Sequence, residues 1–511
     1  MSVDKLRGSK HINRIAPSDI GLLMSAQSYR PEITQAIRKI KSLNWSSLQE
    51  LVVNTISPGP HPKYGGSYPC LKTKNVDDLL ATHEPADYAD SSVFKDLNKV
   101  TVKEGDLLIN LTGAGSIGRV SVYYGKDKPI TNQHIARMSV KSGTDEGYLA
   151  CFLRSWWGER ALEQGVAGST GQINMVNEHV RSIPVYLPDV SAQKYIGDKV
   201  RQAEQLRAWA KRLECSLERL LTLNDDYLSA CNTVETKTSR PQINDLSNRL
   251  DPKYYSNKAI AVHRFARKTG MVLGSLIKSV SNGFEERSFI ESGLAYITVS
   301  EVSSGRLNAQ HAPKISRMVD VPAKAIIHES CVLVVRTGSI GTAVKVHVLD
   351  KGCAISSHLI RLEFNDEETA AAVAVFLNSA AGKVLLHKIS YGAVQPQIGQ
   401  EELLALSIPE YVLAAKAKCL ELLNNYELAT RASMNLTTTA KTLVEALIKG
   451  QLTEQQLIQA QQALDDGDNS LNQAILSKLS NEGYAVEGAE PLFSDIEELY
   501  RLLESAAEVE E

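Results

Sequence analysis

The sequence contains no run of about eighteen consecutive apolar residues, the length that a membrane-spanning helix needs. The first residues, Met1 to Arg14, are polar and lack the apolar stretch of a secretory signal. Cysteines are few, and no two are spaced Cys-x-x-Cys, which argues against a disulfide framework and against a structural zinc site. They are Cys70, Cys151, Cys215, Cys231, Cys331, Cys353 and Cys419. These absences predict a cytoplasmic protein with reduced thiols and no membrane contact.

Three catalytic signatures are also missing. There is no Pro-Pro dipeptide, so the Asn/Asp-Pro-Pro-aromatic motif of amino-methyltransferases is absent. No G-x-x-x-x-G-K-[ST] loop is present to hold the phosphates of ATP. The single Pro-Asp pair, Pro188-Asp189, has no Asp/Glu-x-Lys close behind it, so a nuclease site of that type is unsupported. We therefore predict a protein that is not an enzyme.

The net charge of −3 conceals an uneven distribution of charge. From Gln451 to Glu511 there are 14 acidic and 2 basic residues, a net charge of −12. The first 450 residues carry 54 basic and 45 acidic residues, a net charge of +9. A mildly basic body with an acidic tail suits a polyanionic partner such as DNA.

Six landmarks recur in the same order about 224 residues further along the chain. Gly115-Ser116-Ile117-Gly118 corresponds to Gly338-Ser339-Ile340-Gly341, Asn132-Gln133-His134 to Ser356-Ser357-His358, Phe152-Leu153-Arg154-Ser155 to Phe376-Leu377-Asn378-Ser379, Gly158 to Gly382, Gln172-Ile173-Asn174 to Gln397-Ile398-Gly399, and Ile183-Pro184 to Ile408-Pro409. This period is far too long for a solenoid repeat. The sequence therefore predicts a whole domain that was copied once.

Each copy has the pattern of an α+β domain. A strand (106–110 in the first copy, 331–335 in the second) leads into a glycine-rich turn and then into a segment of alternating valines, which predicts a second strand. A short helix with the Phe-Leu-x-Ser landmark follows, and the copy closes on an extended Ile-Pro segment. The duplicated His134 and His358 have no obvious nucleophile or ligand set near them in the sequence, so we expect both to be buried and hydrogen-bonded.

The turn Gly113–Gly118 fits the dinucleotide fingerprint G-x-G-x-x-G. That fingerprint binds a pyrophosphate only when a helix N-terminus follows, whereas the alternation of Val120 and Val122 predicts a strand. Aligned on the glycines, the second copy has Arg336 where the first glycine should be. We expect the glycines to allow a tight turn, which either serves the fold alone or presents backbone amides to a phosphate.

A long helix is predicted after each copy. Apolar residues at alternating steps of three and four form a seam from Ile196 to Tyr227, interrupted only by Lys199 and Asn224, and a second seam from Ala415 to Leu447. At 1.5 Å per residue each helix is roughly 45–50 Å long. Either helix could pack on its own domain, but two equal seams in one chain favour a coiled coil between them.

The order of these features resembles the specificity (S) subunit of type I restriction-modification systems. The phrases that carry the resemblance are Gly105-Asp106-Leu107-Leu108, Asn132-Gln133-His134, Gly168-Ser169-Thr170…Ile173-Asn174, Ile183-Pro184…Leu187-Pro188, Thr337-Gly338-Ser339-Ile340-Gly341 and Arg249-Leu250-Asp251-Pro252-Lys253-Tyr254-Tyr255. The resemblance extends over about residues 25–450.

The resemblance implies two target-recognition domains, each reading half of a split double-stranded DNA site, with pseudo-twofold symmetry. It implies that the two helices form an antiparallel coiled coil that sets the gap between the half-sites and docks two methyltransferase subunits. Restriction subunits, which are helicase-nucleases, then join the complex. S-adenosylmethionine is held by the methyltransferases, so no cofactor and no metal are expected on this chain.

Residues that read bases are expected where the copies differ, because features shared by both serve the common fold. The candidates are polar or aromatic residues in loop-rich stretches, together with the turn residues that could meet the DNA backbone. In the first copy they are Lys63, Tyr64, Lys72, Lys74, Asn75, Thr112 and Ser116; in the second they are Arg287, Thr298, Glu301, Arg306, Arg336, Thr337 and Ser339. Among them Arg336 is preferred, because it lies beside the shared glycine turn.

Two parts depart from the family pattern. The first copy has only Ser28–Glu32 as a weak counterpart of the Arg-Leu-Asp-x-x-Tyr-Tyr phrase that opens the second. The acidic end, from Gln451 on, has no place in a twofold scheme. We expect short amphipathic helices there, forming a solvated extension, docking to a partner subunit, or occupying a basic groove in place of DNA.

The expected organisation has six parts. They are an N-terminal segment (1–24), a first target-recognition domain (25–190), a first spacer helix (191–235), a second target-recognition domain (236–411), a second spacer helix (412–449) and the acidic extension (450–511). Two alternatives remain. One is a DNA-recognition subunit of another methylation-based phage-defence system, and the other is a protein-interaction scaffold that does not bind DNA.

Overall fold

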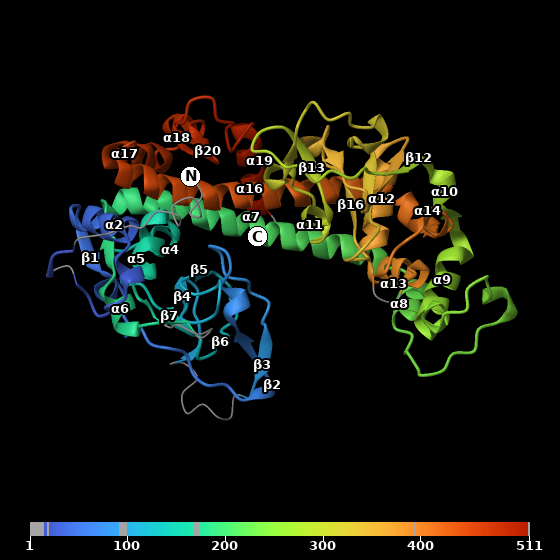
Figure 1. The fold of residues 1–511 in the computed structure, drawn as a ribbon, viewed down its shortest axis with the longest axis horizontal. Coiled ribbons are helices and arrows are strands. Elements are labelled where there is room, and N and C mark those ends of the chain that lie inside the picture. Colours follow the sequence, from blue (N-terminus) through green and yellow to red (C-terminus); the bar gives the residue numbers. More distant parts are fainter. Residues whose placement is uncertain (1–14, 18–19, 91–99, 168–172, 393–394, 509–511) are drawn as a thin grey trace. The chain divides into compact units, whose positions relative to one another are not determined.

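The computed structural model describes residues 15–17, 20–90, 100–167, 173–392 and 395–508 (Figure 1). The phrase Gly168-Ser169-Thr170 lies outside these residues. The chain divides into two compact units: unit 1 comprises Met1–Arg207 and Arg431–Glu511, and unit 2 comprises Ala208–Thr430. Unit 1 is therefore built from two separate stretches of sequence, whereas unit 2 is continuous.

Unit 1 contains the first copy and the acidic end of the chain. Its helices are η2 (Ala26–Tyr29), α2 (Pro31–Lys41), η3 (Leu48–Leu51), η4 (Thr73–Asn75), α4 (Glu146–Arg154), α5 (Trp156–Glu163), α6 (Asn177–Ser182), α17 (Glu454–Asp465), α18 (Ser470–Leu476) and α19 (Ile496–Glu508). Its strands are β1 (Trp45–Ser47), β2 (Tyr64–Leu71), β3 (Asp87–Ala89), β4 (Asp106–Asn110), β5 (Val120–Tyr123), β6 (Ile130–Thr131), β7 (Ile135–Met138), β8 (Val166–Ala167), β9 (Asn174–Met175), β10 (Pro184–Tyr186), β20 (Leu479–Ser480) and β21 (Gly483–Tyr484).

Unit 2 contains the second copy. Its helices are α8 (Asp225–Cys231), η6 (Ile243–Asp245), η7 (Pro252–Tyr255), α9 (Asn257–Thr269), α10 (Leu273–Leu276), α11 (Val299–Val302), η8 (Ala309–His311), η9 (Ala323–Ala325), η10 (Val348–Asp350), α12 (Glu367–Asn378), α13 (Ala380–Ile389), α14 (Gln400–Leu404) and α15 (Glu410–Ala414). Its strands are β11 (Gly270–Val272), β12 (Ile277–Asn282), β13 (Leu294–Ile297), β14 (Lys314–Ile315), β15 (Cys331–Val335), β16 (Ala343–Lys345), β17 (Ala354–Ile355), β18 (Leu359–Phe364) and β19 (Ser407–Pro409).

The two copies share one strand topology. In unit 1 an antiparallel sheet has the order β5-β4-β7, and a second sheet has the order β3-β2-β6, in which β2 pairs antiparallel with β3 and parallel with β6. Unit 2 repeats both sheets, as β16-β15-β18 extended by β12 and as β14-β13-β17. The closing Ile-Pro strand pairs with the strand that opens its copy, β10 with β1 and β19 with β11. This recurrence confirms the predicted duplication and the mixed α+β character of each copy.

The Phe-Leu-x-Ser landmark forms a corner between two helices. The Ser155 hydroxyl donates to the Phe152 carbonyl oxygen (2.6 Å) at the end of α4, and its oxygen accepts from the Gly158 N–H (3.3 Å) at the start of α5. A Cβ on Gly158 would lie 2.1 Å from that same carbonyl oxygen, so only glycine fits there. Ser379 and Gly382 make the same corner between α12 and α13.

A tyrosine anchors the beginning of both copies. The Tyr255 hydroxyl donates to the carbonyl oxygen of Arg249, six residues upstream (2.8 Å), and the Tyr29 hydroxyl donates to that of Leu23, also six residues upstream (2.6 Å). Each hydroxyl also accepts from a backbone N–H eight residues upstream. These bonds make Leu23–Tyr29 the structural counterpart of Arg249–Tyr255, so the predicted stand-in Ser28–Glu32 lies too far along the chain and shares only Ser28 and Tyr29 with it.

Two long helices continue through both units, α7 (Val190–Thr222) and α16 (Lys416–Lys449). In unit 1 the Ser433 hydroxyl of α16 donates to the Ala203 carbonyl oxygen of α7 (2.7 Å). The predicted helix over 191–235 is wrong in its second part, because α7 ends at Thr222. The Asn224 side chain accepts from the Tyr227 N–H (3.0 Å) and starts the separate helix α8.

The acidic end of the chain folds onto unit 1 and is not a solvated extension. We call residues 451–508 the C-terminal cap. Figure 1 shows α17 and α18 on one side of the first part of α7, with α4 and the strands of the first copy on the other. The Tyr186 hydroxyl donates to a Glu454 carboxylate oxygen (2.5 Å), and the Lys194 ammonium pairs with Asp465 (2.9 Å).

A buried polar network fastens the C-terminal cap to α7. The Lys199 ammonium, 1% exposed, donates to the Asn472 side-chain oxygen (2.8 Å), and the Tyr195 hydroxyl donates to the same oxygen (2.8 Å). The Asn472 amide donates in turn to the Tyr500 hydroxyl of α19 (2.5 Å). Lys199, which interrupts the predicted apolar seam, is therefore the residue on which the C-terminal cap docks.

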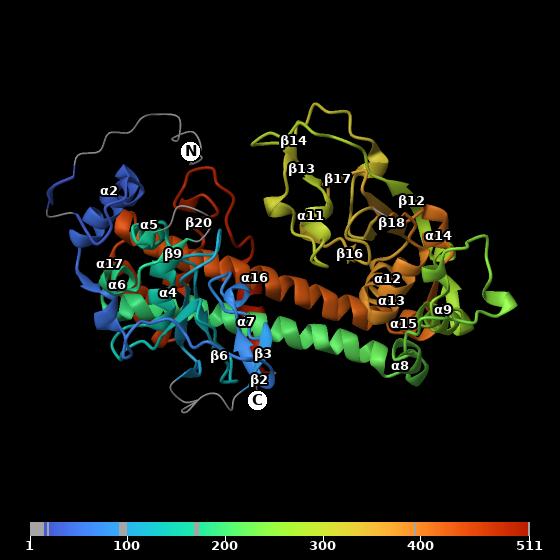
Figure 2. The same ribbon diagram turned by 60° about the horizontal axis from the view of Figure 1, so that its bottom comes forward.

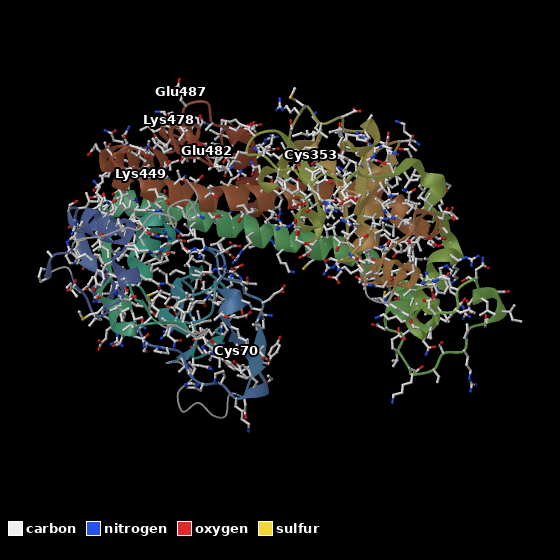
Figure 3. All side chains as sticks on the ribbon, in the orientation of Figure 1. Cys70, Cys353, Lys449, Lys478, Glu482 and Glu487 are labelled. Carbon is white, nitrogen blue, oxygen red and sulfur yellow. The ribbon has the colours of Figure 1, made fainter. Side chains whose placement is uncertain are left out.

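Most carboxylates of the C-terminal cap are exposed to solvent. Glu482 and Glu487 are exposed, and Figure 3 labels both on the cap. These exposed carboxylates do not support the hypothesis that the acidic end occupies a basic groove; Asp465 pairs with Lys194, which belongs to α7 and not to a reader domain. Among the described residues, no single helix has the length and hydropathy of a membrane span. Helices α12 and α13 have that length and hydropathy only when they are taken together, and the chain bends by 79° between them.

Candidate nucleic-acid interface

The glycine-rich turn lies at the end of β4 in the first copy and of β15 in the second. The Leu111 N–H donates to the His134 carbonyl oxygen (2.8 Å), and the Arg336 N–H donates to the His358 carbonyl oxygen (2.8 Å). Arg336 therefore corresponds to Leu111, and the alignment that placed it opposite Gly113 is wrong. The second copy thus puts a half-exposed arginine where the first has a buried leucine.

Glycines open and close both turns because the backbone requires positive φ there. Gly113 (φ 111°) and Gly118 (φ 79°) bound the first turn, and Gly338 (φ 91°) and Gly341 (φ 103°) bound the second, which is two residues shorter. The first turn leads into strand β5, as predicted, and not into a helix. A dinucleotide site of the G-x-G-x-x-G type is thereby excluded at this position.

The two duplicated histidines differ in their surroundings. His134 is half-buried, with its Nδ1 2.8 Å from the Thr112 hydroxyl and its Nε2 3.1 Å from the Gln133 amide nitrogen. His358 is exposed, so the expectation that both histidines are buried is wrong for it. The Thr112 hydroxyl therefore has a structural role, because it holds the His134 ring. It also lies beside the glycine turn.

Residues around the second turn expose one strong hydrogen-bond donor. The Arg336 guanidinium is half-exposed and makes one long contact (3.5 Å) with the Ser357 carbonyl oxygen. Thr337 is 7% exposed and pairs with Gln397, whereas Ser339 is exposed. The corresponding Ser116 of the first copy bonds back to its own turn (3.4 Å to the Thr112 carbonyl oxygen).

Three predicted readers belong instead to a cap that both copies share. The Lys72 N–H donates to the Asn75 side-chain oxygen (2.9 Å), and the Thr298 N–H donates to a Glu301 carboxylate oxygen (2.7 Å); each pair caps the N-terminus of a short helix, η4 after β2 and α11 after β13. Asn75 is 2% exposed, and its amide is used by two carbonyl oxygens. We therefore withdraw Asn75, Thr298 and Glu301 as base readers, because features shared by both copies serve the fold.

Four further first-copy candidates lie on or beside strand β2, which pairs with β3 (Figure 2): Lys63 precedes β2, Tyr64 begins it, Lys72 follows it, and Lys74 lies on η4. Lys63 and Lys74 are exposed, and Tyr64 is 42% exposed. The Lys72 ammonium lies 4.1 Å from the centre of the Tyr64 ring and 2.5 Å from a carboxylate oxygen of Asp87. The hydrogen bond to Asp87 raises the pKa of Lys72, so this lysine stays charged above the ring.

The second-copy candidates are more scattered. Arg287 is exposed, with 86% of its side chain accessible, and it pairs with Glu285 two residues away. Arg306 lies 6.0 Å from the centre of the Tyr426 ring on α16, which fixes it to the helix of unit 2. Arg287 is therefore the exposed guanidinium group among the predicted residues of this copy, while Arg306 and Arg336 are each half-exposed.

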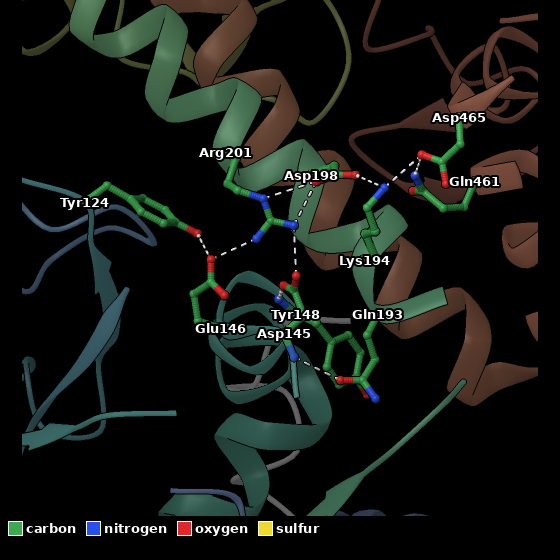
Figure 4. Close-up of polar contacts among 10 residues, drawn as sticks. All are labelled: Tyr124, Asp145, Glu146, Tyr148, Gln193, Lys194, Asp198, Arg201, Gln461 and Asp465. Carbon is green, nitrogen blue, oxygen red and sulfur yellow. Dashed lines mark hydrogen bonds and ion pairs between the residues drawn. The ribbon is translucent and has the colours of Figure 1, made fainter. Parts of the chain in front are cut away.

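Positioning residues on α7 were missed by the sequence analysis. The Arg201 guanidinium bonds to Asp145 and Glu146 at the start of α4 and to Asp198 on its own helix, each at 2.8 Å (Figure 4). Glu146 also accepts from the Tyr124 hydroxyl (3.1 Å). The acidic pair just before the predicted helix was the available signal for this contact.

A second arginine of α7 holds the loop after β2. The Arg207 guanidinium donates to the Leu80 (3.1 Å) and Ala81 (2.9 Å) carbonyl oxygens and lies 3.0 Å from His83 Nε2. Burial, together with the positive charge of Arg207, lowers the pKa of His83 to about 4, so His83 is neutral at pH 7. Arg201 and Arg207 thus attach the first copy to α7 at two separate places.

The described residues contain no group of three histidine, cysteine or acidic side chains placed to hold a metal ion. The described cysteines are all free, and burial raises the pKa of Cys70 and Cys353 to about 11. The accessible chemistry of the candidate interface consists of lysines, arginines, tyrosine rings and hydroxyl groups. Such groups suit phosphate oxygens and base edges.

Residues 61–219 match the protein family described as "Type I restriction modification DNA specificity domain". No curated protein sequence matches the chain. One similar solved structure is the type I restriction-modification S subunit from M. genitalium (14% identity, 79% of this chain, 96% of that chain, TM-score 0.44). Another is the HsdS subunit from Thermoanaerobacter tengcongensis (14% identity, 80% of this chain, 97% of that chain, TM-score 0.28).

Proposed function

We propose that this chain, whose residues 61–219 belong to the family of type I restriction modification DNA specificity domains, is the DNA-reading subunit of a type I restriction-modification complex. One observation carries the proposal. The strand order and the glycine turn that the family match covers in unit 1 recur in unit 2, so the chain has a second reader of the same kind.

The two readers recognise different halves of one split site. Arg336 replaces Leu111, and the turn beside it is two residues shorter, so the copies present different groups to a base pair. Two unlike readers joined by a spacer of fixed length would give a bipartite, asymmetric target with a fixed gap, much as half-site spacing follows from the geometry of a dimer. We assign α7 and α16 the role of this spacer, as an antiparallel coiled coil.

The chain delivers the target to partners that carry the chemistry. Methyltransferase subunits holding S-adenosylmethionine dock on it, and helicase-nuclease subunits join them. The accessible lysines, arginines, tyrosine rings and hydroxyl groups bind and orient DNA. No residue of this chain is assigned a catalytic role.

Methylome sequencing of cells with and without the gene tests the function. We expect one bipartite, non-palindromic methylated motif with a fixed gap that disappears with the gene. A continuous or palindromic motif that depends on this gene would contradict the proposal. Binding that does not weaken as salt rises would contradict it too, because bound phosphates release counterions and make DNA binding steeply salt-dependent.

We expect Arg336→Ala to weaken DNA binding by about 1–3 kcal/mol and to relax base preference at one position of one half-site, because a bidentate arginine contact to guanine is lost. Arg336→Leu is the matched control for folding, since leucine stands at the equivalent position of the first copy. Equilibrium binding to duplexes varied at each position measures both variants. Unchanged affinity and base preference for the two would remove Arg336 from the interface.

A further inference from the structure

Strand β2 contains a bulge that has no counterpart in the second copy. Tyr64 and Tyr68 both lie opposite Ala89 of β3, so no residue of β3 is in register with Gly65, Gly66 and Ser67. The equivalent pairing of β13 with β14 is regular, with Leu294 opposite Ile315 and Ala295 opposite Lys314. The bulge therefore lies where the two copies differ, as expected for a reader and not for the shared scaffold.

The two glycines make this bulge possible. Gly65 has a φ of 95°, which side-chain-bearing residues rarely adopt. A Cβ on Gly66 would lie 2.2 Å from the Ala89 carbonyl oxygen, so the bulged strand passes directly against β3. Beyond the bulge, the Asp90 N–H donates to the Lys63 carbonyl oxygen (2.8 Å) and closes the ribbon again. Bulges of this kind re-aim side chains and are common beside functional sites.

The Tyr64 side chain, at the start of the bulge, is held in a defined place. Tyr64 is 42% exposed, and the Lys72 ammonium over its ring is fixed by Asp87 on the neighbouring strand. Ser67, within the bulge, is exposed, and so is Lys63 immediately before it. The bulged start of β2 thus presents a fixed aromatic ring, an exposed hydroxyl and flanking positive charges together.

We infer that the bulged segment Lys63–Ser67 is the base-reading element of the first target-recognition domain, with Asp87 as a positioning residue that acts through Lys72. This inference rests on the proposed function. The major groove is about 12 Å wide and admits a two-stranded β-ribbon, so β2 and β3 can enter it together. The hydroxyl groups of Tyr64 and Ser67 then meet base edges, and Lys63 meets a phosphate.

The test compares full-length variants expressed from the intact locus, with the methylated motif as the measurement. Tyr64→Ala should relax base preference in one half of the motif by about tenfold at one position, the loss of one good base contact. Tyr64→Phe separates the hydroxyl from the ring, and Asp87→Asn should shift the same positions more weakly. The other half of the motif should not change in any of these variants.

Tyr88 provides the matched control. It is 49% exposed on the same ribbon, but it alternates with Asp87 and Ala89 and so faces away from the Tyr64–Lys72 contact. Tyr88→Ala should leave the motif unchanged, and Gly66→Ala should disturb the same half of the motif as Tyr64→Ala.

The inference is overturned if Tyr64→Ala methylates the wild-type motif to the wild-type extent, or if Tyr88→Ala has the larger effect. Failure of the proposed function gives a different result, because the wild-type gene would then specify no motif, or a continuous or palindromic one. If Gly66→Ala prevents folding, the Tyr64 variants still decide the matter.

Discussion

Asn472→Leu is expected to lower the free energy of unfolding of unit 1 by about 3 kcal/mol, because it leaves a buried, charged donor without its acceptor. The Lys199 ammonium is 1% exposed, and Asn472 is its hydrogen-bond partner among the described residues. The variant also removes the acceptor of the Tyr195 hydroxyl and the donor to Tyr500. The melting temperature should fall by roughly 6–10 °C, measured by calorimetry.

Lys199→Met should rescue most of this loss when it is combined with Asn472→Leu, because no charged group is then left in the apolar contact. Asn481→Leu, at an exposed asparagine of the same C-terminal cap, is the control and should change stability by less than about 0.5 kcal/mol. Equal stability of the Asn472→Leu and Asn481→Leu proteins would show that Lys199 does not depend on the C-terminal cap.

The same lysine predicts a pH dependence. Burial lowers the pKa of Lys199 from 10.5 to about 8, so between these values the unfolded chain binds more protons at this residue than the folded chain. Stability contributed by this group therefore rises as the pH increases from about 8 to 10.5, and the cost of the buried charge is fully present below pH 8. Denaturant titrations of wild type and Lys199→Met across this range should diverge in that direction; parallel curves would contradict the shift.

Arg201→Met should cost about 3 kcal/mol of unfolding free energy at pH 7, because it leaves Asp145 and Glu146 as neighbouring carboxylates without their cation. Burial already raises the pKa of Asp145, and loss of the arginine raises it further. A carboxyl whose folded pKa is raised destabilises the fold as the pH rises through that window. The deficit of the variant should therefore shrink as the pH is lowered toward 4.

Arg219→Met, at an exposed arginine of the same helix, is the control for removing a surface charge from α7. Denaturant unfolding at several pH values measures both variants. A deficit in Arg201→Met that grows on acidification, or one that Arg219→Met shares, would show that the Arg201 network does not hold the first copy on α7 in the way described.

The elements of the fold were predictable wherever the sequence carries a local signal. The strands after the glycine turns follow from period-two alternation, those before the turns from short apolar runs, and the long helices from their seams. Asn224 was visible as an interruption, but a seam that resumes at Tyr227 does not distinguish a continuous helix from a new helix that asparagine caps. The spacer helix was therefore predicted too long.

Contacts between distant segments were not predictable in the same way. Lys199 breaks the apolar seam of α7, yet only the folded chain identifies Asn472, 273 residues away, as its partner. Aligning the turns on their glycines misplaced Arg336, because a turn two residues shorter looks in sequence like a shift of the whole motif. Strand hydrogen bonds fix the equivalence with Leu111, and they depend on pairing that no local pattern records.

The division of the chain also sets an order of assembly during synthesis. Unit 2 is one continuous stretch, so it can close once the ribosome has released residue 430. Unit 1 begins earlier in the chain but needs residues 431–511, including Asn472, before the side chain of Lys199 is covered. Domains usually complete in order from the N-terminus. Here we expect the half that is made first to be finished last, with the part of α7 around Lys199 left uncovered in the interval.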